Sequence, residues 1–126
     1  MTRYRMWGGA MAIEGEAIPS QLRKGVVELA VLALLHRGEA YGAEIVDRLV
    51  QYPGLAISAG TAYPLLNRLK KSGLITSEWQ ESPVGPPRKY YRLSPAGERA
   101  FVAMTKVWTA MSADMTDLLG KDATRA

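Results

Sequence analysis

The chain has 126 residues, the length of one domain or of one domain with an appendage. It contains no cysteine, which excludes disulfide bonds, thiolate metal sites and a cysteine nucleophile. No apolar run is long enough to span a membrane, and the first 16 residues make a poor signal peptide. We therefore expect a cytoplasmic protein with no membrane partner.

The positive charge of the chain is concentrated in one segment. Residues 58–92 hold six lysines and arginines against two glutamates, a formal charge of +4. The ten bases and ten acids in the rest of the chain cancel. Such a concentrated patch is typical of a surface that binds an acidic partner.

The first 19 residues are expected to form a partly disordered N-terminal extension, because three glycines and Pro19 interrupt any long helix. Ser20 is expected to cap a helix over residues 21–37 that is apolar nearly all round. One face of this helix suits the core of the domain, and the remainder suggests contact with a second subunit. His36, the only histidine, falls in its last turn, where we assign it a helix-end role because no metal ligands are spaced near it.

Two shorter helices are expected next, joined by a tight connection that is typical of a helix-turn-helix unit. The first covers residues 42–51, and the sequence Tyr52-Pro53-Gly54 ends it. Its buried face is expected to hold Ile45, Val46, Leu49 and Val50.

The second of these helices lies in the stretch from Ser58 to Ser72, where Ser58 has the chemistry of an N-cap. Apolar residues recur there at i, i+3, i+4 and i+7, which predicts one buried stripe. The other side carries hydroxyl, amide, aromatic and basic groups without a carboxylate, and it suits a groove lined with phosphates. A solvated basic helix face is the alternative interpretation. The stripe is Ala62, Leu65, Leu66 and Leu69, and the other side holds Thr61, Tyr63, Asn67, Arg68, Lys70 and Lys71.

A β-hairpin is expected after this helix, with strands over residues 74–81 and 88–93 and a proline-rich turn between them. A hairpin in this position is a wing, and Arg88 and Lys89 beside its tip suit a DNA backbone or minor groove. Strand alternation predicts that one of Tyr90 and Tyr91 points inward and the other outward.

The last helix is expected over residues 95–119, since Ser94-Pro95 is a strong helix start, and residues 120–126 are expected to fray. Large apolar residues alternate at spacings of three and four along it, which predicts a seam for self-association rather than for packing within one subunit. Trp108, with Met104 and Met111 beside it, suits a slot for a planar aromatic molecule, although a packed interface tryptophan is the simpler interpretation. The predicted seam is Phe101, Met104, Trp108, Met111, Met115 and Leu118.

Four segments together resemble the PadR family of bacterial transcriptional regulators: LRKGVVELAVLALL, AYGAEIVDRL, ISAGTAYPLLNRLKKSGLITSEW and GPPRKYYRLSPAGE. The resemblance covers about residues 22–118. It implies a mainly α fold with a small β-hairpin (α+β), in which a winged helix-turn-helix domain over 20–93 is followed by a C-terminal dimerisation helix over 94–119. It places Ser58, Thr61, Tyr63, Asn67 and Arg68 on the DNA face of the recognition helix and Arg88 and Lys89 in the wing.

The resemblance also implies a homodimer that represses a nearby promoter. Many members respond to a small inducer, often a phenolic acid or a lipophilic drug, and Trp108 stands where multidrug-binding members have an aromatic slot. We therefore expect a repressor that binds an inverted-repeat operator in double-stranded DNA and is released by a small aromatic or lipophilic ligand. The alternative is a winged-helix protein-interaction module that binds an acidic partner. An enzyme is disfavoured, since the sequence has no catalytic triad, paired-carboxylate motif or phosphate-binding loop, and we expect no catalytic residue, metal or cofactor.

Overall fold

The computed structural model describes the backbone of residues 17–125 and the side chains of residues 21–120. Predictions that fall on residues 1–16 lie outside the described residues. The elements in chain order are α1 (Ala17–His36), β1 (Ala40–Tyr41), α2 (Gly42–Leu49), the 3₁₀ helix η3 (Pro53–Leu55), α3 (Ala59–Lys71), β2 (Ile75–Gln80), β3 (Arg88–Leu93) and α4 (Pro95–Arg125).

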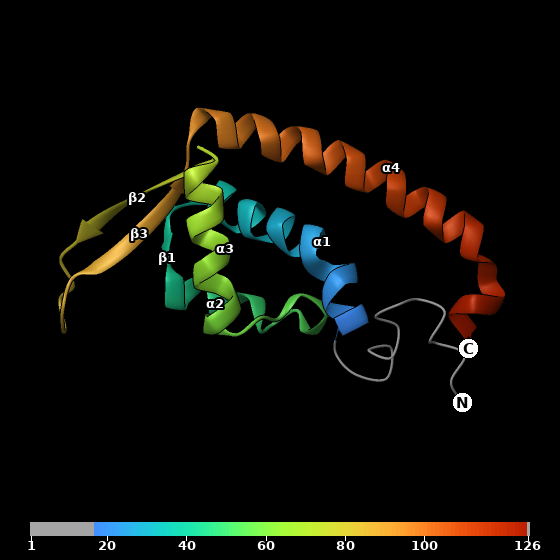
Figure 1. Cartoon of the computed structure of the whole chain (residues 1–126), viewed down its shortest axis with the longest axis horizontal. Helices are drawn as coiled ribbons and strands as arrows, with labels where there is room; N and C mark the ends of the chain where they lie inside the picture. Colours follow the sequence, from blue (N-terminus) through green and yellow to red (C-terminus); the bar gives the residue numbers. More distant parts are fainter. Residues whose placement is uncertain (1–16, 126) are drawn as a thin grey trace.

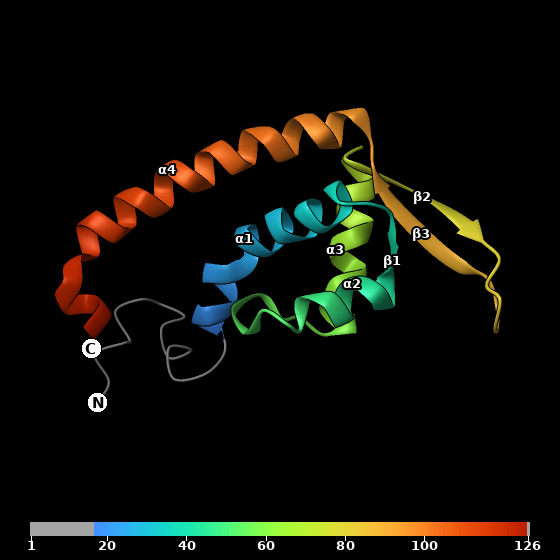
Figure 2. The same ribbon diagram turned by 180° about the vertical axis from the view of Figure 1, so that it is seen from behind.

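The elements form a small helical body from which two parts project, as Figures 1 and 2 show. The hairpin of β2 and β3 extends from one end of the body, and α4 runs over α1 toward the opposite end. Helix α3 lies between the hairpin and α1. The predicted mainly α fold with a small β-hairpin is confirmed.

The core lies where α1, α2, α3 and the base of the hairpin meet. Its largest fully buried side chains come from all four parts: Leu32, Val31, Ile45, Leu49, Leu66 and Ile75. The apolar stripe predicted on α3 is confirmed, because each of its four residues is at most 4% exposed. Burying this stripe fixes the opposite side of α3 toward solvent.

The sheet has three antiparallel strands in the order β1-β3-β2. β1 was not predicted, since two residues are too few for an alternation pattern. It pairs Ala40 with Tyr91 and Tyr41 with Tyr90. Tyr91 is buried and Tyr90 is half-buried on the other face, which confirms the predicted alternation of the two rings.

Three predicted element boundaries are wrong. Helix α1 begins at Ala17 rather than after Ser20, with Pro19 in the first turn, where a missing N–H breaks no helical hydrogen bond. Helix α2 ends at Leu49, so Val50 lies beyond it and is exposed rather than part of a buried face. Helix α4 has its predicted interruption at Gly120, which has a φ of 71°, but helical backbone resumes and reaches Arg125 where fraying was expected.

Helix α4 is anchored to the body through its first two turns. Ser94 caps it by accepting a hydrogen bond at Oγ from Gly97 N (3.0 Å), and Ser94 Oγ donates to Gly73 O (2.6 Å). A Cβ at Gly97 would overlap the carbonyl of Leu74, so only glycine allows this close approach. His36 at the end of α1 pairs with Glu98 (Nδ1 to Oε1, 2.8 Å), which gives its predicted helix-end role a partner on α4.

Candidate functional site

The outer side of α3 presents the residues that the sequence pattern singled out. Ser58 is the N-cap, and its Oγ accepts a hydrogen bond from Thr61 N at 3.3 Å. Asn67 lies near the centre of the exposed side, opposite the buried stripe. The seven predicted residues of this region are all exposed: Ser58, Thr61, Tyr63, Asn67, Arg68, Lys70 and Lys71.

These residues do not form a single patch, because five of them line two separate hollows on the two flanks of the helix, and Lys70 and Lys71 line neither hollow. Tyr63 and Asn67 line a groove between α3 and the hairpin, which we call the wing groove. Ser58, Thr61 and Arg68 line a hollow between α3 and α1, which we call the basic hollow. The prediction grouped them correctly on one helix but did not separate its two flanks.

The wing groove has a volume of about 650 Å³ and combines aromatic rings with positive charge. The Arg88 guanidinium lies 4.4 Å from the centre of the Tyr41 ring, and the Lys89 ammonium lies 5.8 Å from that of Trp79. Trp79 is 66% exposed, although sequence reasoning treated it only as a strand former. The groove is lined by Tyr41, Gly42, Ala43, Tyr63, Asn67, Trp79, Pro87, Arg88, Lys89 and Tyr91.

The Tyr63 side chain lies close to two other residues of this groove, Gly42 and Tyr91. A Cβ at Gly42 would lie 2.7 Å from Tyr63 Oη, so glycine at the start of α2 lets the Tyr63 ring lie against that helix. Burial raises the pKa of the Tyr91 phenol, and the nearby Tyr63 phenol adds to the rise. The Tyr91 phenol, which lines the groove, therefore stays neutral. The positive charge of the groove comes from Arg88 and Lys89.

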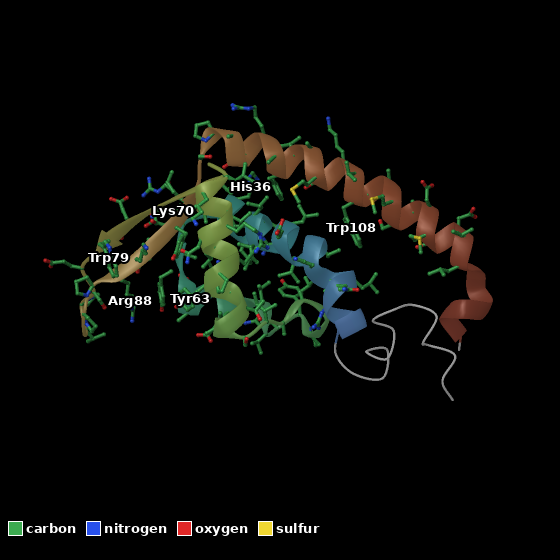
Figure 3. All side chains as sticks on the ribbon, in the orientation of Figure 1. His36, Tyr63, Lys70, Trp79, Arg88 and Trp108 are labelled. Carbon is green, nitrogen blue, oxygen red and sulfur yellow. The ribbon has the colours of Figure 1, made fainter. Side chains whose placement is uncertain are left out.

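The basic side chains of the region differ in whether a carboxylate already neutralises them. Arg92 pairs with Glu39 (2.7 Å) and Glu78 (3.0 Å) on the outer face of the sheet, and Arg68 pairs with Glu28 of α1 (2.6 Å). Four of the predicted bases form no ion pair with any residue whose side chain the structure describes: Lys70, Lys71, Arg88 and Lys89. Their charge is available to an acidic partner. Figure 3 shows Lys70, Arg88 and Tyr63 spread over α3 and the hairpin.

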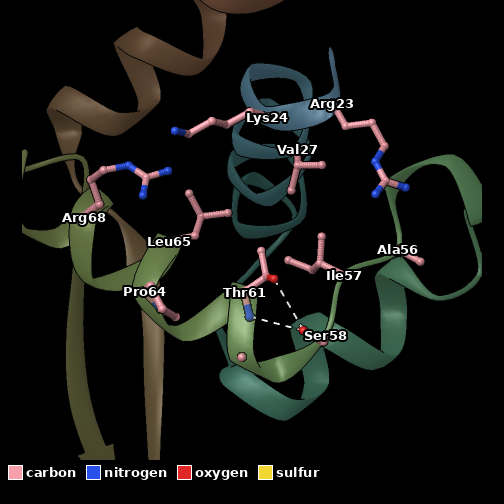
Figure 4. A pocket seen from close by; sticks show the side chains of 11 residues that line it. Arg23, Lys24, Val27, Ala56, Ile57, Ser58, Thr61, Pro64, Leu65 and Arg68 are labelled. Carbon is pink, nitrogen blue, oxygen red and sulfur yellow. Dashed lines mark hydrogen bonds between the residues drawn. The ribbon is translucent and has the colours of Figure 1, made fainter. Parts of the chain in front are cut away.

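The basic hollow has a volume of about 490 Å³ and contains two bases that sequence reasoning missed. Arg23 and Lys24 of α1 line it together with Arg68, above an apolar floor (Figure 4). No sequence signal connected them with α3, because they precede it by more than 30 residues on a helix that reads as apolar. The complete lining is Arg23, Lys24, Val27, Ala56, Ile57, Ser58, Gly60, Thr61, Pro64, Leu65 and Arg68.

An apolar groove of about 410 Å³ lies on the other side of α1, against α4. It contains all three residues predicted to bind a ligand, Met104, Trp108 and Met111. Trp108 is 44% exposed, and Figure 3 shows it on the side of α4 that faces α1. The groove is lined by Leu22, Gly25, Val26, Leu29, Ala103, Met104, Val107, Trp108 and Met111.

The predicted seam of α4 divides into two parts. Phe101 and Met104 pack against the core of their own subunit, and the Phe101 ring stacks on His36 at 4.5 Å. The four residues farther along are exposed although they are large and apolar, from Trp108 at 44% to Leu118 at 79%. This second part consists of Trp108, Met111, Met115 and Leu118.

Among the described residues no cluster of three or more His, Asp or Glu side chains could hold a metal ion. Within the same part of the chain, none of the helices has the length and apolar character needed to cross a membrane.

Comparison with known proteins identifies close relatives. Residues 31–103 match the family described as the transcriptional regulator PadR-like family. The transcriptional regulator Rv3488 of Mycobacterium tuberculosis is 36% identical over 80 residues, which cover 64% of this chain and 73% of the relative.

The fold is also similar to solved structures of transcriptional regulators. A PadR-like regulator from Bacillus cereus matches with a TM-score of 0.73 and 34% identity, covering 79% of this chain and 97% of that one. PadR of Bacillus subtilis in complex with operator DNA matches with a TM-score of 0.58 and 26% identity, covering 64% of this chain and 46% of that one.

Proposed function

The chain belongs to the PadR-like family of transcriptional regulators, and we propose that it represses transcription as a homodimer that binds an inverted-repeat operator in double-stranded DNA. The family is one of regulators, which agrees with the expectation that the chain is not an enzyme. The observation that carries the proposal is the exposed side of α3, where Asn67 lies near Lys70 and Lys71, two bases that pair with no described carboxylate.

Helix α3 enters the major groove in this proposal. An amide side chain at the centre of the exposed face suits an adenine edge, which offers one donor and one acceptor to Asn. Lys70, Lys71, Arg88 and Lys89 suit phosphates, which position the protein without reading sequence. The wing groove brings Arg88 and Lys89 beside α3, so helix and wing contact one duplex together.

The second half of the α4 seam supports the homodimer. An exposed row of Trp108, Met111, Met115 and Leu118 is costly for a lone subunit in water, and the same row on a second copy can cover it. In the proposed dimer, a two-fold axis through this contact relates the two copies of α3, as an inverted repeat requires. Their half-sites are then expected about one helical turn apart, ~10 base pairs, or a multiple of that spacing.

The apolar groove supports control by a ligand. Methionine and tryptophan walls adapt to flat aromatic molecules, and the groove lies between α1 and α4, the helices closest to the proposed dimer contact. Because α1 also borders the basic hollow, a ligand that moves α1 changes the DNA-binding side. We propose that a small aromatic or lipophilic inducer binds here and releases the operator.

Selection from a pool of random 30-base-pair duplexes tests the DNA-binding proposal, because the protein itself picks out the sequence that it prefers. Successive rounds with the full chain at physiological salt should enrich an inverted repeat, and the selected duplex should bind about 10³-fold or more tighter than its scrambled version. A pool that stays random would contradict the proposal and favour a protein-interaction module with an acidic partner.

A further inference from the structure

Arg23 and Lys24 of α1 have no role in the function proposed so far, and their surroundings suggest one. They converge with Arg68 of α3 on the basic hollow, so bases from two helices face one concave surface (Figure 4). Lys24 and Arg68 extend toward one another above Leu65, and Arg23 extends toward Ala56 on the other side of the opening. Ser58 and Thr61 also line the hollow, and the Ser58 hydroxyl donates a hydrogen bond to Thr61 Oγ1 (3.4 Å).

We propose that the basic hollow holds a stretch of sugar–phosphate backbone on the flank of α3 that faces away from the wing. This inference rests on the proposed function, since it assigns a contact within the same complex. It makes Arg23 and Lys24 DNA-binding residues and gives α1 a direct part in binding.

The position of the hollow matches the geometry of the major groove, which is about 12 Å wide and bounded by two phosphate backbones. A helix lying in that groove has one backbone on each flank. Tyr63 and Asn67 mark the flank of α3 that faces the wing, where Arg88 and Lys89 supply charge. The opposite flank needs its own cations, and the structure places Arg23, Lys24 and Arg68 there.

The lining of the hollow fits a nucleic-acid backbone better than a free inorganic anion. Val27, Ile57 and Leu65 form an apolar floor below the basic rim. A deoxyribose presents C–H groups next to its phosphate, so the sugar suits the floor while the phosphate oxygens meet the rim. An inorganic anion would leave this apolar floor without a partner.

Glu28 of α1 lies beside the hollow through its ion pair with Arg68 and lowers the positive charge there. Glu28 of α1 accepts a charge-assisted hydrogen bond from Arg68 (Oε2 to Nη2, 2.6 Å), which holds the guanidinium at the edge of the hollow. Arg23 and Lys24 form no ion pair with residues whose side chains are described. Counted over the side chains that the structure describes, the hollow therefore keeps a positive charge after the Arg68–Glu28 pair.

The test is the salt dependence of DNA affinity for the full-length double variant Arg23→Gln/Lys24→Gln. Each phosphate contact contributes about 0.9 to the slope of log affinity against log salt. Loss of two contacts should therefore lower the slope by about 1.8, and it should weaken binding to operator and scrambled duplex by similar factors. The melting temperature should stay that of the wild type, because Lys24 is exposed and Arg23 only partly covered.

The matched control is Arg99→Gln/Lys106→Gln, which removes the same charge from exposed positions on α4. Its salt slope should stay close to that of the wild type. Equal slopes for the two double variants would overturn the inference while leaving the proposed function intact, provided that the wild type binds DNA with a steep slope. A wild type that shows no salt-dependent DNA binding would overturn both.

Discussion

Helix α1 has two faces that differ in charge. One face, with Arg23 and Lys24, borders the basic hollow beside α3. The other, with Leu22 and Val26, borders the apolar groove beside α4. Because neighbouring residues on a helix lie about 100° apart, two adjacent positions such as Leu22 and Arg23 can serve different surfaces.

The difference between the two faces shows how one small chain can hold two kinds of partner apart. Phosphates favour the side of α1 with bases and hydroxyl groups. A second subunit and a flat ligand favour the side with methionine, tryptophan and aliphatic groups. We therefore expect DNA to bind on the α3 side of α1 and apolar partners to bind on the α4 side.

The largest effect is expected from Met111→Asp, which places a charge in the exposed part of the α4 seam. Burying that carboxylate in a dimer contact without a partner costs several kcal/mol. The dissociation constant of the dimer should therefore rise by about a hundredfold or more. Light scattering should report a monomer at concentrations where the wild type is a dimer. Ala113→Asp, exposed on the opposite side of α4, is the control and should stay dimeric. A dimer of unchanged strength in Met111→Asp would show that the exposed row is not the dimer contact.

The next two substitutions distinguish a residue that contacts a base from a residue that contacts a phosphate. Asn67→Ala should reduce the preference for operator over scrambled duplex by about 1–3 kcal/mol, because it removes the proposed base contact. Arg88→Ala should weaken binding to both duplexes alike and lower the salt slope by about 1. Fluorescence anisotropy on both duplexes at several salt concentrations measures these quantities. Two variants that behave identically would contradict the assignment of different roles.

The sequence predicts the local features of α3 more completely than those of α4. The buried stripe and cap of α3 follow from short-range patterns, and the structure confirms them. The seam of α4 was harder, since Phe101 faces the core and Met111 faces solvent at the same helical period. The pattern marks one side of a helix but cannot show where the helix leaves the domain.

The basic hollow could not be predicted from the sequence for a different reason. Arg23 joins Arg68 only through packing of α1 against α3, which no local pattern encodes. The wing groove could be predicted in part. Arg88 and Lys89 stood out in the sequence as bases, whereas Trp79 was indistinguishable from an ordinary strand residue. β1 is similarly invisible, since its two residues gain their strand conformation from pairing with β3.

An effect of similar size is expected on the α4 side when planar aromatic cations or phenolic acids are added. A variant with Trp7 and Trp79 replaced by phenylalanine leaves Trp108 as the only indole, and binding compounds should quench its fluorescence saturably. The same compounds should weaken operator binding by about 5- to 150-fold, the usual range for coupled sites. The control variant, which keeps Trp79 as the only indole, should not respond. If no compound changes the signal and acrylamide cannot reach Trp108, the groove is filled by dimer packing.

The smallest effect concerns alkaline stability on the DNA side. Burial raises the pKa of Tyr91, so the folded state favours the neutral phenol. This contribution to the free energy of unfolding is complete below the ordinary tyrosine pKa of about 10 and is lost as pH rises through the folded-state value. The melting temperature of Tyr91→Phe should therefore fall less than that of the wild type when the pH is raised from 7 to about 11. Identical losses in the two proteins would contradict the role of Tyr91 as a buried neutral phenol.

Acrylamide quenching of the two single-tryptophan variants during operator titration distinguishes DNA binding on the α3 side of α1 from DNA binding on the α4 side. Trp79 lies in the wing groove and is 66% exposed before DNA arrives, whereas Trp108 lies in the apolar groove. Operator DNA should shield Trp79 from acrylamide in proportion to the bound fraction and leave the quenching of Trp108 unchanged. Shielding of Trp108 by operator, with Trp79 left fully accessible, would show that DNA binds on the α4 side of α1 instead.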